Sequence, residues 1–132
     1  MPRRTDSCNP ADWLLIAGTD LEMIRLCCEH ETAFAVCRAK LSEVIEKLLK
    51  AELIRLGWFL KKTHDLRHLT SELRALGSDL PPVIDALVES FAEVYFTDRY
   101  PGFDLEDPDW PAFRAHLAEV EHLLATVQAR IG

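Results

Sequence analysis

Hydrophobic residues recur every three or four positions along most of the chain, which is the spacing of a helix with one buried face. The pattern predicts a first helix that Asn9 caps, with Pro10 at its first position, and that frays near His30. We expect the buried face of this helix to hold Trp13, Ile16, Ala17, Ile24 and Cys27.

A second, longer helix is predicted from about Thr32 to Leu56, with Gly57 as its stop. Its apolar stripe is Phe34, Cys37, Leu41, Val44, Ile45, Leu48 and Leu56. The opposite side is charged, and glutamates there precede lysines by four residues, which favours side-chain pairing on a solvated helix face. These pairs are Glu43 with Lys47 and Glu46 with Lys50.

A short third helix is predicted between Thr63, a good N-cap residue, and Gly77, with Asp65 in its first turn. Leu66, Leu69 and Leu73 form its apolar face.

A fourth helix follows, capped by Asp79 or Ser78, and breaks at Pro101-Gly102. Pro81 and Pro82 occupy its first turn, and its buried stripe is Ile84, Leu87, Val88, Phe91, Val94 and Tyr95. Residues 99–109 read as a loop. Asp109 then caps a last helix with Pro111 near its start and a seam of Phe113, Leu117, Val120, Leu124, Val127 and Ile131.

The sequence therefore predicts an all-α fold, an antiparallel up-and-down helical bundle of four main helices plus one short helix. With 132 residues, the chain is expected to form a single domain over 1–132.

The charge of the chain is acidic overall and unevenly placed. A formal net charge of −7 argues against a general nucleic-acid binder, which needs a basic face. Residues 38–74 hold nine Lys/Arg and five Asp/Glu, whereas residues 89–109 hold seven acids and one arginine. The two regions could attract each other within the fold or across a dimer, or could simply be solvated helix faces.

The four cysteines include no CxxC pair, so they indicate neither a disulfide framework nor a zinc site. Thiols of this kind fit a reducing cytoplasm, where we expect the protein to be located. The early apolar run WLLIAG is too short for a signal segment or a membrane span, so we expect no membrane association.

The polar segment FLKKTHDLRHL, residues 59–69, is the main candidate for chemistry. His64 and His68 have the four-residue spacing of a shared metal site, but a third ligand is not evident. Glu119 and His122 form one Glu-x-x-His, whereas a di-iron bundle needs that motif twice. Without a Gly-rich phosphate loop or a GxSxG motif, we expect no metal and no cofactor.

Arg25 and His30 are the candidate pair for catalysis. A guanidinium and an imidazole about one turn apart could hold a phosphodiester and move its proton, as a metal-independent ribonuclease does. The spacing also arises easily by chance.

Several segments, in their order along the chain, resemble HEPN-domain proteins. The resemblance covers about residues 12–127 and is carried most specifically by EKLLKA (46–51), KTHDL (62–66) and RYP (99–101). It implies a helical bundle that is often a homodimer and is frequently encoded beside a minimal nucleotidyltransferase, as a two-component or toxin–antitoxin system. Some members bind nucleotides, and some are ribonucleases with an Arg-x4–6-His motif near the end of the bundle.

The chain departs from the ribonuclease branch because no histidine follows Arg99 at that spacing, and Arg25-x4-His30 lies elsewhere in the topology. We therefore expect no catalytic residues. The site expected for a nucleotide, RNA or other anion is instead Lys61, Lys62, His64, Asp65, Arg99 and Tyr100, next to the start of the third helix. The alternative is that Arg99 only pairs with Asp65 or Asp104.

Three functions follow from these observations. The first is a non-catalytic HEPN-like module, a homodimer that partners a minimal nucleotidyltransferase and binds a nucleotide or RNA. The second is a ribonuclease that uses an Arg/His pair, and the third is a bundle that only binds other proteins, through its acidic loop 98–109 and an exposed helix face.

Overall fold

The chain folds into helices alone. The computed structural model describes residues 2–131, and every regular element in that range is an α-helix. In chain order these are α1 (Pro10–Glu29), α2 (Phe34–Arg55), α3 (Leu66–Ala75), α4 (Pro81–Phe91), α5 (Val94–Thr97) and α6 (Trp110–Ile131). The predicted all-α bundle is confirmed.

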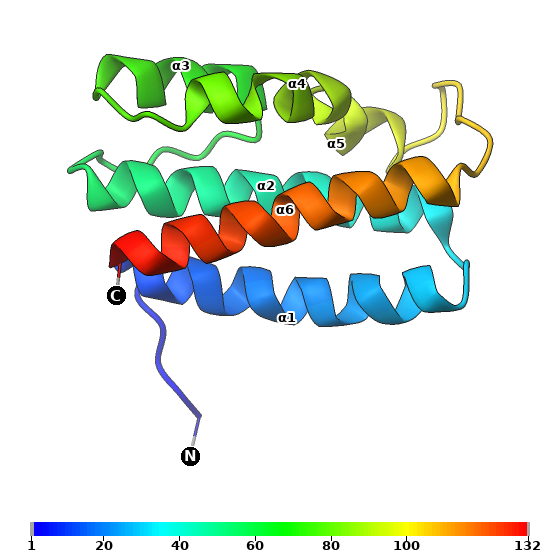
Figure 1. Cartoon of the computed structure of the whole chain (residues 1–132), viewed down its shortest axis with the longest axis horizontal. Coiled ribbons are helices and arrows are strands. Elements are labelled where there is room, and N and C mark those ends of the chain that lie inside the picture. The colour runs from blue at the N-terminus through cyan, green and yellow to red at the C-terminus, as the bar shows by residue number, and fades with distance from the viewer. Residues whose placement is uncertain (1, 132) are drawn as a thin grey trace.

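Helix α2 lies at the centre of the bundle and contacts all the others. Helices α1 and α6 pack against it and against each other, and α3, α4 and α5 cover its other side (Figure 1). Helix α1 runs opposite to α2, whereas α6 runs in the same direction as α2, with Phe34 against Trp110 at their starts and Glu52 against Arg130 at their ends. The α2–α3 connection turns back along α2 and lies between α2 and the α3–α4 layer (Figure 1).

Several helix ends are set by the residues that the sequence indicated. The Asn9 side chain accepts a hydrogen bond from the Ala11 amide at 3.0 Å, and Pro10 is the first residue of α1. Gly57, with φ of +92°, ends α2 in a Schellman motif, in which the amide of Trp58 donates to the Leu53 carbonyl. The Ala112 amide donates to Asp109 at the start of α6.

Other helix ends differ from the predictions. Asp65, not Thr63, is the N-cap of α3, because its carboxylate accepts a hydrogen bond from the His68 amide at 3.1 Å. Helix α4 starts after Leu80, and no side chain caps it; Ser78 instead binds the amide of Leu80 in the preceding turn.

The fourth predicted helix is also interrupted. It ends at Phe91 and resumes as the single turn α5, which stops at Thr97 before the predicted break.

The core is built from the apolar stripes of α2, α4 and α6, largely as predicted. On α1 the predicted face is wrong in part. Ile16 is exposed and Trp13 is half-buried, whereas Leu14 and Leu21 are buried together with the expected Ala17 and Ile24. Helix α1 is apolar on more than one side, so periodicity alone did not fix the side that packs inward.

None of the helices within residues 2–131 combines the length and the hydrophobicity needed to cross a membrane.

Candidate functional site

Three segments that are distant in sequence meet at one corner of the bundle. His64, in the α2–α3 connection, donates from Nδ1 to Glu46 of α2 at 2.8 Å. The His64 ring stacks on the Tyr95 ring of α5, with centroids 4.1 Å apart and 11° between the planes. The Arg99 guanidinium lies 4.5 Å from the centroid of the same tyrosine ring. We call these residues, with Glu43 and Lys50, the corner site.

Local structure explains how Tyr95 of α5 and Arg99 in the turn that follows it are presented together. Tyr95 and Arg99 are four residues apart, which places them on one side of a helical turn. Val94 is buried and fixes this turn against the core. Because the Arg99 amide donates to the Phe96 carbonyl in the turn after α5, the Tyr95 ring and the Arg99 guanidinium lie on the same side of the chain.

His64 is held by the start of α3. It directly precedes Asp65, the N-cap of that helix, and the Asp65 amide donates to the Thr63 hydroxyl at 3.2 Å. Leu66, the next residue, is buried. The imidazole itself remains about half exposed, with 49% of its side-chain surface accessible.

A buried ion pair forms the floor of the corner site. Lys50 donates to Glu46 at 2.9 Å, and these residues are only 4% and 7% exposed. The Lys50 ammonium also lies 5.4 Å from the centroid of the Trp13 ring, a cation–π contact. The predicted Glu46–Lys50 pairing is confirmed, but its predicted place on a solvated face is wrong, because α1 and the α2–α3 connection cover it.

Arg99 pairs with Glu43, 2.5 Å away, and not with Asp65 or Asp104 as expected. Burial raises the pKa of Glu43, but hydrogen bonds from Arg99 and Lys40 outweigh that effect and leave the pKa below its ordinary value. The hydrogen bond to Glu43 raises the pKa of Arg99 in return. Glu43 therefore holds two cations on the exposed edge of the site and does not pair with Lys47.

The remaining predicted site residues surround this cluster less closely. Lys61 pairs with Glu72 of α3 at 3.0 Å, and Lys62 and Tyr100 are exposed. Asp65 uses its carboxylate to cap α3 and so occupies the backbone amide that was expected to face an anion. The structure brings together His64 and Arg99 among the predicted residues, and Tyr95 joins them.

The basic and acidic regions of the sequence pair within the fold. Arg67 of α3 binds Glu89 and Glu93 beside α4, with nitrogen–oxygen distances of 3.0 and 2.8 Å. Arg38 of α2 contacts Asp98 and Glu106, and so ties the acidic loop to the central helix. These pairs account for much of the charge separation seen in the sequence.

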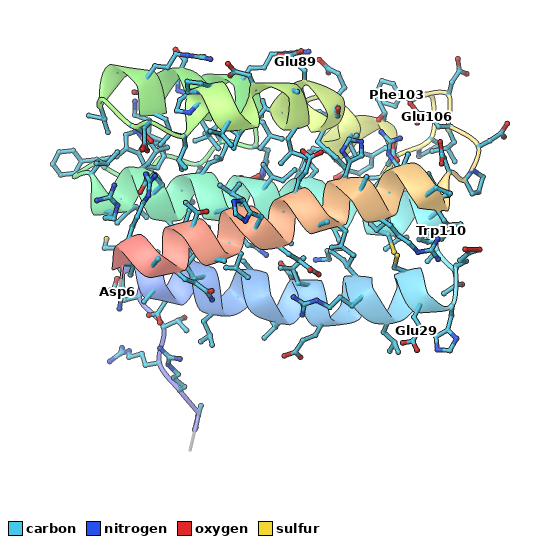
Figure 2. The ribbon with its side chains drawn as sticks, viewed as in Figure 1. Asp6, Glu29, Glu89, Phe103, Glu106 and Trp110 are labelled. Carbon is cyan, nitrogen blue, oxygen red and sulfur yellow. The ribbon has the colours of Figure 1, made fainter. Side chains whose placement is uncertain are left out.

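A hollow of about 240 Å³ lies between α2, α4 and α6. Two of its lining residues are Arg38, whose Nε lies 3.2 Å from Asp98, and His116, whose buried Nδ1 makes no hydrogen bond. Glu106 of the loop before α6 borders it, near the end of the molecule where Trp110 begins that helix (Figure 2). No pattern in the sequence indicates this hollow, because its lining comes from three helices and a loop.

The residues of the other two candidate pairs, Arg25 with His30 and His64 with His68, do not act together, because they have different surroundings and partners. Arg25 donates to Glu121 of α6 at 2.8 Å, and His30 is the exposed residue that ends α1. Five residues along a helix turn the side chain by about 140°, so the two point to different sides. His68 pairs with Glu72, and within residues 2–131 no three His, Cys, Asp or Glu side chains gather as metal ligands.

Sequence reasoning missed Tyr95 and Glu43 as members of the site. Tyr95 was assigned to a buried stripe, and Glu43 was paired with Lys47. The one available signal was the four-residue spacing of Tyr95 and Arg99, which fits a shared helical face.

The family model described as HEPN domain matches residues 10–129. No curated protein and no solved structure matches the chain. The segments EKLLKA, KTHDL and RYP, which carried the resemblance, meet in or beside the corner site, where Glu46, His64 and Arg99 are found. With a match that spans most of its length and a fold made only of helices in the described range, this chain belongs to the HEPN-domain family.

Proposed function

We propose that this chain is a non-catalytic HEPN module that binds a nucleotide or an RNA phosphate at the corner site. It would act as a homodimer with a minimal nucleotidyltransferase as its partner, as in toxin–antitoxin systems. The observation that carries the proposal is that His64 and Arg99, from two distant motifs, both contact the ring of Tyr95.

Arg99 can accept a phosphate by exchanging its present partner. The Arg99–Glu43 pair is partly exposed, with 32% of the arginine side-chain surface accessible. Exposed ion pairs contribute only about 0–1 kcal/mol, so a doubly charged phosphate competes well for the guanidinium. Glu43 keeps Lys40, at 3.1 Å, as its counterion. Lys62 and the ring of Tyr100, both exposed, are available for further phosphate and base contacts.

Isothermal titration calorimetry with mono- and dinucleotides tests the ligand. We expect binding to wild type and a loss of at least tenfold in affinity for Arg99→Ala. Arg74→Ala is the matched control, because Arg74 is also an exposed arginine in an ion pair, with Asp85, but lies away from the site. No heat with any nucleotide, or an equal loss in both variants, would rule the ligand out.

Co-expression tests the partner. A minimal nucleotidyltransferase encoded next to this chain should co-purify with it at a fixed stoichiometry through size-exclusion chromatography. Separate elution of the two proteins would argue against the partnership, but it would not test whether this chain binds a nucleotide.

A second candidate is a ribonuclease that uses His64 and Arg99 in place of Arg25 and His30. The favouring observation is the Glu46–His64 hydrogen bond, because a carboxylate that orients an imidazole is the usual companion of a general base. His64 Nε2 would take the proton of a ribose 2′-hydroxyl, which attacks the adjacent phosphorus. The 5′-oxygen would leave as a hydroxyl by taking that proton from the imidazolium, and Arg99 would stabilise the added negative charge. RNA cleavage with 2′,3′-cyclic phosphate ends, lost in His64→Ala, would support it; intact RNA would exclude it.

A further inference from the structure

Helix α1 exposes an apolar face to solvent. Leu15, Ile16, Met23 and Leu26 are 40%, 41%, 40% and 58% exposed. Helix α1 packs against α2 and α6, and its opposite side lies at the edge of the bundle, with no other helix beside it (Figure 1). Four large apolar side chains on one uncovered helix face are typical of an interface.

The four residues form two rows whose midpoints are one residue apart along the helix. Ile16 and Met23 are seven residues apart, about two turns, and Leu15 and Leu26 are eleven apart, about three turns. Both midpoints fall within one residue of Asp20. A two-fold axis at this point that reverses the helix direction therefore places Ile16 against Met23 of a second copy, and Leu15 against Leu26 of that copy. Self-complementarity of this kind is what a symmetric dimer requires.

The surface beside Ile16 is hollowed. A depression of about 170 Å³ is lined by Trp13 and Ile16 of α1, by Lys47 of α2 and by the segment that precedes α1. The antiparallel arrangement directs Met23 of the second copy toward this depression. Methionine suits it, because the flexible thioether fills irregular apolar space.

Charges at the two ends of α1 favour the same arrangement. Arg4 is exposed in the segment before α1, which extends past the uncovered side of the helix (Figure 1), and Glu29 is exposed in the last turn. The ends are far apart in one copy, as the positions of Asp6 and Glu29 in Figure 2 show. A glutamate near a helix C-terminus is unfavourable in an isolated chain, but an antiparallel neighbour brings a positive helix N-terminus and Arg4 to it.

We propose that this face of α1 is the interface between two copies of the chain, packed antiparallel about a two-fold axis beside Asp20. This proposal rests on the proposed function only in taking the chain to be a homodimer. It adds which surface forms the dimer interface.

Disulfide trapping tests the direction of packing. In a Cys8→Ser background, a mixture of Leu15→Cys and Leu26→Cys chains should form a covalent heterodimer under mild oxidation, and neither variant alone should form much homodimer. Predominant self-linkage of Leu15→Cys, or the absence of any linkage, would overturn the proposal.

Sedimentation analysis tests the surface itself. Wild type should be a dimer, and Leu15→Glu and Met23→Glu should each raise the dimer dissociation constant at least tenfold while the far-UV circular dichroism spectrum stays unchanged. Val83→Glu is the matched control, because Val83 is a 75% exposed apolar residue on α4. A monomeric wild type, or equal effects of all three variants, would refute the interface.

Nucleotide titration of the Met23→Glu monomer separates the two proposals. Most of the corner site lies on the side of α2 that faces α3 and α5, whereas the uncovered face of α1 points away from α2. Trp13, which contacts Lys50, also borders the depression beside Ile16. A monomer that still binds nucleotide would confirm that the interface and the ligand site are independent. Loss of binding in a folded monomer would contradict the placement of the interface away from the site.

Discussion

The buried pair beneath the corner site gives a quantitative test of the structure. Replacing Lys50 with methionine keeps much of the side-chain volume but removes the ammonium that lies 2.9 Å from Glu46. Glu46 would remain buried with the half-exposed His64 as its partner. Removing one member of a buried ion pair costs about 3–5 kcal/mol, because the other charge loses its compensation. Against a total stability of about 5–15 kcal/mol, this loss is large.

The double variant separates this charge effect from packing. Glu46→Leu combined with Lys50→Met replaces both charges with apolar groups, which is often neutral or even stabilising for a buried pair. We expect the double variant to lie within about 1 kcal/mol of wild type, and therefore to be clearly more stable than the Lys50→Met single variant. His64 can then bind water, since half of its side-chain surface is accessible.

Urea unfolding followed by far-UV circular dichroism measures the free energy of unfolding of wild type, the two single variants and the double variant. The slope of free energy against urea should be equal among the variants, because each exposes nearly the same surface on unfolding. A Lys50→Met variant within about 1 kcal/mol of wild type would show that the pair is solvated in the folded protein. A double variant as unstable as the single variant would show that the loss comes from packing against Trp13 and not from an uncompensated charge.

Further predictions concern acid stability, capping, helix propensity and thiol reactivity. Burial raises the pKa of Glu52, but hydrogen bonds from two arginines more than offset it and keep the pKa below the ordinary 4.5. The folded state thus favours the ionised form, and its contribution to stability is full above pH 4.5 and is lost as the pH falls through the folded pKa. Arg130→Met, which removes one of the two arginines, should flatten this acid-side loss in urea titrations at several pH values. Asp65→Ala should lower the free energy of unfolding by about 1 kcal/mol through loss of the α3 cap, with Asp65→Asn close to wild type. Gly18→Ala should raise the melting temperature, because a Cβ there meets no atom within 4 Å and alanine favours a helix interior by up to about 1 kcal/mol. Burial raises the pKa of Cys37 to about 12, so iodoacetamide should label this thiol only after unfolding; rapid labelling of the native protein would contradict its burial.

The corner site illustrates how a small bundle can combine rigidity with an exchangeable surface. Its lower layer, Glu46 and Lys50, is fixed by burial and by their positions on one helix. Its upper layer, His64 and Arg99, is partly exposed and is held by a ring contact and single ion pairs. A ligand could therefore replace Glu43 at Arg99 without disturbing the packing of the core.

The sequence by itself determined which segments form helices, where several of these helices begin and end, and the family of the chain. Periodic apolar residues, Pro10, Gly57 and Asp109 act through contacts within one helix or one turn, and such contacts do not depend on the rest of the fold. For the same reason the resemblance, carried by short motifs in order, was enough to indicate a HEPN bundle, which the family match confirms.

Only the tertiary structure decided which faces meet. Helix α1 is apolar on two sides, and packing against α2 and α6 buried Leu14 and Leu21 and left Leu15 and Leu26 outside. The burial of the Glu46–Lys50 pair had the same cause. A charged helix face is predicted to be exposed to solvent, and only the folded structure shows that a neighbouring segment covers it. Such side-chain pairings join segments far apart in the chain, and their geometry depends on how whole helices cross, which no local pattern of residues specifies.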